Sequence, residues 1–93
     1  SRSDDIFALF HLPIGYKITE VDIYSSANLT FALEYGSFNS DSTTSIETGG
    51  TTNSTLTLSS AETVEKRRYY IVSIEYTATS EEIWGGRITL EKV

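Results

Sequence analysis

The feature that most constrains this chain is a regular alternation of side chains between Tyr69 and Thr79. Every second residue is apolar: Tyr70, Val72, Ile74, Tyr76 and Ala78. The residues between them start apolar, at Tyr69 and Ile71, and then become polar. Successive side chains of a β-strand point to opposite faces, so the pattern predicts a strand with one buried face whose first half is covered on both sides. We expect a central strand around which the others pack.

Shorter stretches of the same kind recur along the chain, separated by turn residues. They predict strands over residues 6–12, 16–24, 28–35, 55–58 and 83–90. The second of these changes phase, because Ile18 lies on one face and Val21 and Ile23 lie on the other. A β-bulge near Thr19 and Glu20 would bring all three apolar side chains to the core.

Residues 36–54 form the longest segment without a clear alternation, and ten of these nineteen residues are Ser or Thr. Long irregular segments in compact domains are often binding loops, which is the first interpretation. A short, Thr-rich edge strand at residues 43–47 is the alternative. Residues 61–68 are expected to form one helical turn or a wide loop, with Val64 tucked beneath it.

Together these segments predict an all-β fold: a single antiparallel β-sandwich, jelly-roll-like, with six to eight strands and no significant helix. The 13 Ser, 13 Thr, six Tyr and four Phe favour exposed and half-buried sheet faces over helices. One domain spans residues 1–93, with residues 1–3 read as a remnant outside the fold. The strand order stays open between jelly-roll and immunoglobulin-like topologies. Because the chain contains no Met, we expect it to be a piece of something longer.

Charge and composition argue against several classes of function. The net charge of −6 disfavours nucleic-acid binding, because a phosphate backbone would be repelled. The longest apolar run, residues 6–10, is too short to span a membrane. The absence of cysteine excludes disulfides and thiolate metal sites.

Catalytic and metal chemistry also lack the usual residues. His11 is the only histidine and there is no cysteine, so we expect neither a catalytic triad nor a transition-metal site built from the usual ligands, and a packed or partner-facing imidazole is expected. The adjacent carboxylates Asp4–Asp5 and Glu81–Glu82 would point to opposite faces of a strand. We therefore expect no enzyme, no metal and no cofactor.

Two groups of residues are candidates for binding. The segment around Ile6, Phe7, Leu9 and Phe10 is apolar on both faces, which indicates one side packed on the sandwich and the other against a partner chain. Trp84, beside two glycines, and Tyr35 are candidates for stacking on sugar rings together with the 36–54 segment. For Trp84, core or interface packing is the competing interpretation.

A wider pattern links the turns and strands: Leu-Pro-x-Gly-x-x-Ile-x-x-Val, an alternating strand, a Ser/Thr-rich segment, Tyr-Tyr-x-Val, and Ile-aromatic-Gly-x-Arg-Ile-Thr. It resembles small β-sandwich modules of bacteriophage structural proteins (capsid decoration, tail or fibre components) and related uncharacterised secreted bacterial proteins. The matching residues are Leu12, Pro13, Gly15, Ile18, Val21, Tyr69, Tyr70, Val72, Ile83, Trp84, Gly85, Arg87, Ile88 and Thr89.

The resemblance implies a non-enzymatic structural module of a virion that acts through protein–protein contacts. It implies a virion or extracellular location and self-association, with a trimer favoured, or binding to a larger coat protein. The alternative is a carbohydrate-binding or receptor-binding β-sandwich module, with a glycan as partner. Neither interpretation involves nucleic acid or a membrane.

Overall fold

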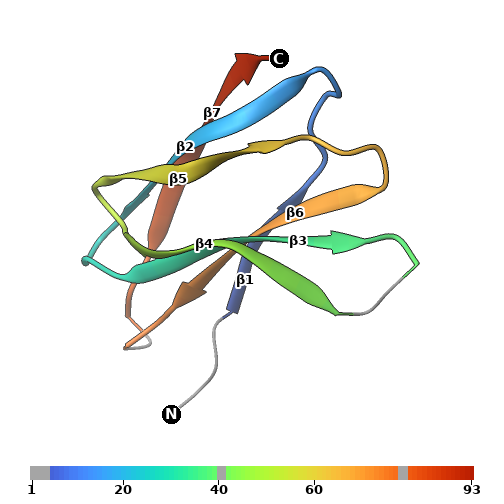
Figure 1. Ribbon diagram of the computed structural model, residues 1–93. Helices are drawn as coiled ribbons and strands as arrows, with labels where there is room; N and C mark the ends of the chain where they lie inside the picture. The colour runs from blue at the N-terminus through green and yellow to red at the C-terminus, as the bar shows by residue number, and fades with distance from the viewer. Residues whose placement is uncertain (1–4, 40–41, 78–79) are drawn as a thin grey trace.

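The computed structural model describes the backbone of residues 5–39, 42–77 and 80–93, and side chains from residue 9 onward within these ranges. Seven strands form two antiparallel sheets packed face to face, and the described residues contain no helix (Figure 1). The strands are β1 (Asp5–Phe10), β2 (Tyr16–Ser25), β3 (Thr30–Ser37), β4 (Thr43–Thr51), β5 (Thr55–Thr63), β6 (Arg68–Glu75) and β7 (Ile83–Lys92). The predicted all-β sandwich is confirmed.

The four-stranded sheet has the order β1-β6-β3-β4, and the three-stranded sheet has the order β5-β2-β7. Strand β6 lies between β1 and β3, as expected for the central strand. Its inward side chains, Tyr70, Val72 and Ile74, are buried in the core. On the opposite face Ile71 and Ser73 are buried as well, so the predicted double coverage is also confirmed.

The predicted bulge in β2 is present. The register of β2 shifts between Ile18 and Glu20 against both of its neighbours, β5 and β7. As a result Ile18, Val21 and Ile23 are all buried in the core. The extra residue resets the alternation of side chains, which is the reason for the phase change in the sequence.

The prediction of a long irregular segment after residue 36 was wrong for most of its length. Residues 43–51 form β4, so the alternative of an edge strand was right and the strand continues beyond residue 47. For residues 61–68 a helical turn or a wide loop was expected. Residues 61–63 extend β5 and residues 64–67 form a short loop, so the helical turn was wrong, and Val64 is buried as expected. Strand β4 lies at the edge of its sheet and is mostly exposed, and hydrophobic periodicity gives little signal for such strands.

Consecutive strands mostly lie in different sheets. Among the described strands, β3 and β4 are the one consecutive pair that hydrogen-bonds within a single sheet. Strand β5 then crosses to pair with β2, and β6 returns beside β3, which is a Greek-key connection spread over two sheets. The first and last strands lie in different sheets, and the start of β1 and the end of β7 lie at opposite ends of the molecule (Figure 1).

A buried polar contact ties two of these crossings together. The fully buried Thr52, in the β4–β5 turn, accepts a hydrogen bond through Oγ1 from the Leu29 amide (2.7 Å) and donates one to the Ala27 carbonyl (3.0 Å). The Ser25 hydroxyl also lies 2.7 Å from this oxygen. Residues 25–29 join β2 to β3, so one threonine hydroxyl fixes both connections at this end of the sandwich.

Replacing Thr52 by Val keeps the shape of the side chain but removes the hydroxyl. The Leu29 amide and the Ser25 hydroxyl would then be buried without this partner. We expect Thr52→Val to lower the free energy of unfolding by about 1–3 kcal/mol, measured by urea denaturation followed by circular dichroism. Thr51→Val, at the exposed neighbouring residue, is the control and should change it by less than about 0.5 kcal/mol. Equal effects of the two variants would contradict this role of Thr52.

Candidate interaction surface

The outer face of the four-stranded sheet, which points away from the three-stranded sheet, carries an exposed apolar side chain at its β1 edge. Leu9 is 57% exposed and lies opposite Ile71 in the register between β1 and β6. Ile71 is only 2% exposed, although no second sheet covers it. Its directly opposed neighbours on the same sheet face are Leu9 and Glu34.

An aromatic stack continues this surface toward the end of the sheet. Phe38, which is 59% exposed, lies parallel to Tyr69 with ring centroids 6.1 Å apart. His11 meets Phe38 edge to face, with centroids 5.3 Å apart. We call the five residues Leu9, His11, Phe38, Tyr69 and Ile71 the outer patch.

A glycine positions the stack. Gly36 lies directly opposite Tyr69 in the register between β3 and β6. A Cβ atom at Gly36 would fall 2.4 Å from the Tyr69 ring, so the ring lies flat across the glycine. This packing holds Tyr69 low on the sheet and gives Phe38 a flat surface to stack on.

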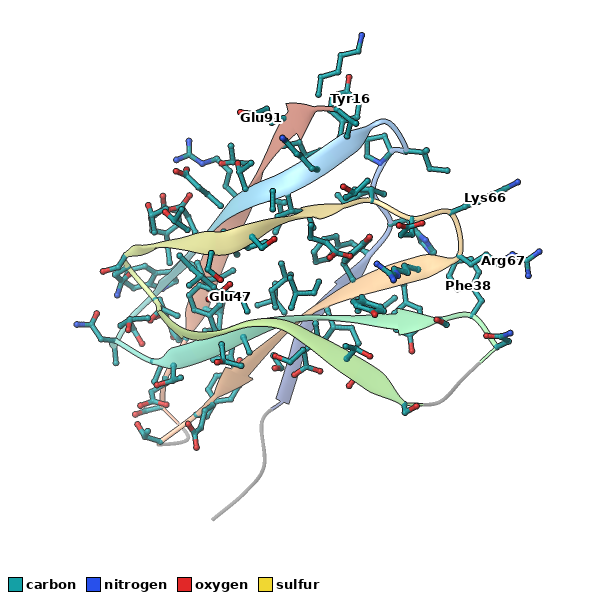
Figure 2. The ribbon with its side chains drawn as sticks, viewed as in Figure 1. Tyr16, Phe38, Glu47, Lys66, Arg67 and Glu91 are labelled. Atoms are coloured by element: carbon teal, nitrogen blue, oxygen red, sulfur yellow. The ribbon has the colours of Figure 1, made fainter. Side chains whose placement is uncertain are left out.

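Two cations border the patch. Lys66 and Arg67, in the loop before β6, are exposed and point away from the molecule beside Phe38 (Figure 2). The Phe38 amide donates a hydrogen bond to the Arg67 carbonyl (3.2 Å), which holds this loop against the end of β3. Within the part of the chain that the structure describes, neither side chain forms an ion pair, whereas Arg68 binds Glu62 at 2.7 Å.

Arg68 covers the ring of Tyr35, one of the two predicted stacking residues. Its guanidinium lies 3.8 Å from the centre of the Tyr35 ring, a cation–π contact. Burial opposes the charge of Arg68, but the nearby Glu62 carboxylate outweighs this effect and the pKa of Arg68 is raised. One face of the Tyr35 ring is therefore occupied by a stable cation.

The other predicted stacking residue, Trp84, lies elsewhere. It is 67% exposed near the start of β7, and its indole nitrogen donates to the Glu82 carboxylate (3.3 Å). Arg68, which covers Tyr35, binds Glu62, and Glu62 lies in the same cross-strand row as Leu90. Trp84 lies six positions before Leu90 in β7, which is about 20 Å of extended strand. The structure thus does not bring Trp84 and Tyr35 together into one site.

The four predicted interface residues of the first strand also separate. Leu9 points outward, whereas Phe10 packs against the core with its ring centroid 6.3 Å from that of Tyr70. The side chains of Ile6 and Phe7 lie outside the described residues. β1 is an edge strand whose pairing with β6 shifts register between Ile6 and Ala8.

Sequence reasoning missed the aromatic part of the outer patch. It expected a packed or partner-facing imidazole at His11, but it gave Phe38 no role of its own within the 36–54 segment and none to Lys66 or Arg67 within the 61–68 segment. The signal lay in the pairing of Gly36 with Tyr69, which requires the strand register. Alternation within one strand cannot supply that information.

No group of three or more His, Asp or Glu residues in the described ranges is arranged to hold a metal ion. The same ranges contain no helix that is long and apolar enough to cross a membrane. Comparison of the chain with protein families, with characterised proteins and with solved structures gives no match. The resemblance to phage modules therefore rests on the matching residues alone.

Beneath the patch, Tyr70 is a fully buried phenol whose oxygen accepts a hydrogen bond from the Glu65 amide (3.2 Å). Burial raises the pKa of Tyr70 above its ordinary value of 10.0. The folded state therefore holds this proton more tightly than the unfolded state does. Its contribution to stability is fully present below the unfolded pKa and is lost as the pH rises through the folded pKa.

We expect the free energy of unfolding to fall above about pH 10, with Tyr70 adding up to about 1.4 kcal/mol per pH unit to the slope. Tyr70→Phe should remove this part of the slope, as measured by urea denaturation over a series of alkaline pH values. Tyr24→Phe, at an exposed tyrosine, is the matched control. The same slope in wild type and Tyr70→Phe would show that Tyr70 does not titrate differently in the two states.

Proposed function

We propose that this chain is a non-enzymatic structural and interaction module of a virion, as a capsid decoration, fibre or tail component, that works through protein–protein contacts at the outer patch. The observation that carries the proposal is the 57% exposure of Leu9 on an edge strand, beside a row of apolar and aromatic side chains. Exposed contiguous apolar surface in a small domain commonly marks an interaction site.

The character of β1 supports this choice of surface. Proteins usually protect edge strands with charged side chains, proline or mainly polar sequences. Strands β4 and β5 are rich in Ser and Thr, and β7 carries Arg87, Glu91 and Lys92. Strand β1 has one charge, at Asp5, followed by five apolar residues. It is therefore the edge with the least protection against pairing with another chain.

The class of partner follows from the resemblance described above. Phage modules of this kind assemble with copies of themselves or with a larger coat protein. A second copy of this chain is the simplest partner, because packing copies around a symmetry axis would bury the apolar side chains of the outer patch. The resemblance favours a trimer, and a virion or extracellular location.

A carbohydrate-binding or receptor-binding module is the second candidate, and the exposure of Trp84 favours it. Tyr24, another exposed aromatic residue, pairs with Gly85, the residue next to Trp84. Stacking of sugar rings would use Trp84 from the three-stranded sheet rather than Tyr35. Titration of Trp84 fluorescence with a broad panel of glycans tests this candidate. A glycan that shifts the emission, and whose binding heat measured by calorimetry is lost in Trp84→Leu, supports it.

The main proposal is tested by the mass in solution, measured by light scattering after size exclusion at two concentrations. Wild type should associate, and Leu9→Asp should shift the dissociation constant at least about tenfold toward monomer, because burying the new carboxylate is unfavourable. Tyr24→Asp makes the same chemical change on the three-stranded sheet and is the matched control. If Leu9→Asp associates as wild type does, the outer patch is not the contact surface.

A further inference from the structure

The charges of this molecule are sorted toward its two ends. The Val64 amide donates to the Tyr16 carbonyl (2.9 Å), and Tyr16 lies opposite Lys92, so the β5–β6 loop, the start of β2 and the end of β7 share one end. Five of the seven Lys and Arg residues lie there: Lys17, Lys66, Arg67, Arg68 and Lys92. Three described carboxylates accompany them, at Glu62, Glu65 and Glu91. We call this the basic end.

The opposite end is acidic. It is formed by residues 26–29, 52–54, 75–77 and 80–82, which contain no Lys or Arg. Glu75 and Glu82 are exposed there, and Glu81 binds the Thr77 amide (2.8 Å). No cation pairs with Glu75 or Glu82 within the described ranges of the chain. We call this the acidic end.

Each end also carries an exposed apolar side chain. Ile14, in the turn between β1 and β2, is 62% exposed at the basic end, and Trp84 is 67% exposed beside Glu82 at the acidic end. The two ends are therefore complementary in charge and both contain apolar surface. Neither is complementary to itself, because like charges would be brought together.

We propose that copies of this chain associate head to tail, with the basic end of one copy against the acidic end of the next. Lys66 and Arg67 would approach Glu75 and Glu82, and Ile14 and Trp84 would supply apolar contact. The occupant is a second copy because the complementary surface is present on the chain itself. This inference goes beyond the proposed function and does not require the outer patch.

The geometry of such a contact differs from that of a symmetric dimer. The two surfaces that meet are different, so each copy keeps one free end. Depending on the rotation between copies, the result is a closed ring or an open filament. Because the cations and carboxylates are exposed, the contact would weaken as salt screens them.

The first test measures the self-association of wild type by sedimentation at about 0.01 M and about 0.15 M salt. Between these salt concentrations the screening length falls from about 30 Å to about 8 Å. We expect the self-association constant to fall about tenfold over this range. Lys66→Glu/Arg67→Glu makes both ends acidic, and Glu75→Lys/Glu82→Lys makes both ends basic. Each variant should lose self-association at low salt.

Mixing the two variants gives the decisive result. Because one variant has only acidic ends and the other only basic ends, the mixture should associate. The variant that combines all four substitutions again has one end of each charge and should self-associate. Glu20→Lys/Glu47→Lys is the control, because it makes the same change in net charge as Glu75→Lys/Glu82→Lys but in the middle of the strands. Circular dichroism checks that each variant is folded. A mixture that stays monomeric at low salt would overturn the inference.

The same measurements separate this inference from the proposed function. Leu9→Asp alters the outer patch and leaves both ends intact, so it should retain salt-sensitive head-to-tail association. If the charge variants behave as wild type while Leu9→Asp dissociates, the head-to-tail contact is wrong and the outer patch stands. If the mixture associates while Leu9→Asp matches wild type, the outer patch is not the contact surface and the head-to-tail contact stands.

Discussion

The burial of β6 on both faces is the constraint on which the rest of this structure depends. Its inner face contributes Tyr70 and its neighbours to the core, as in any sandwich. Its outer face holds Ile71, for which no second sheet is available. Leu9 lies directly opposite Ile71 on this face and is itself 57% exposed. The apolar outer face of the central strand is thus continued to the β1 edge of the sheet by an exposed apolar side chain.

In two places an aromatic ring packs flat over a glycine of the neighbouring strand. Tyr69 lies across Gly36 on the outer face, and Phe31 lies across Gly50 in the core, where an added Cβ would fall 2.8 Å from the ring. Both are directly opposed cross-strand pairs. A ring that lies flat over a glycine of the neighbouring strand buries more of its own area than a ring that projects away from the sheet. This burial matters because a 93-residue chain has only a thin core. The polar contact of Thr52 complements this packing by fixing the connections at the acidic end.

Alternation within the sequence was sufficient for the strands that are buried on at least one face. It located β6 and its double coverage, and the phase change in β2 located the bulge at residues 18–20. It failed for β4, whose Thr and Ser residues face solvent at a sheet edge. It could not place Arg68 on the Tyr35 ring or separate Trp84 from Tyr35, because these relations depend on strand order and register. The sorting of charge between the two ends was hidden for the same reason, since it requires the direction of every strand.

The outer patch and the two ends use different physics, and they lead to different kinds of assembly. The patch offers apolar and aromatic area on one sheet face, so its contribution is short-ranged, depends on close packing and is little affected by salt. The ends offer separated charges on a molecule of net charge −6, so they act at longer range and are screened. A contact between patches can close around a symmetry axis, whereas a contact between ends joins unlike surfaces and gives a ring or a filament. If both proposed contacts form, a closed group made through the patch would be extended along one axis through the ends, which is the geometry that a fibre requires.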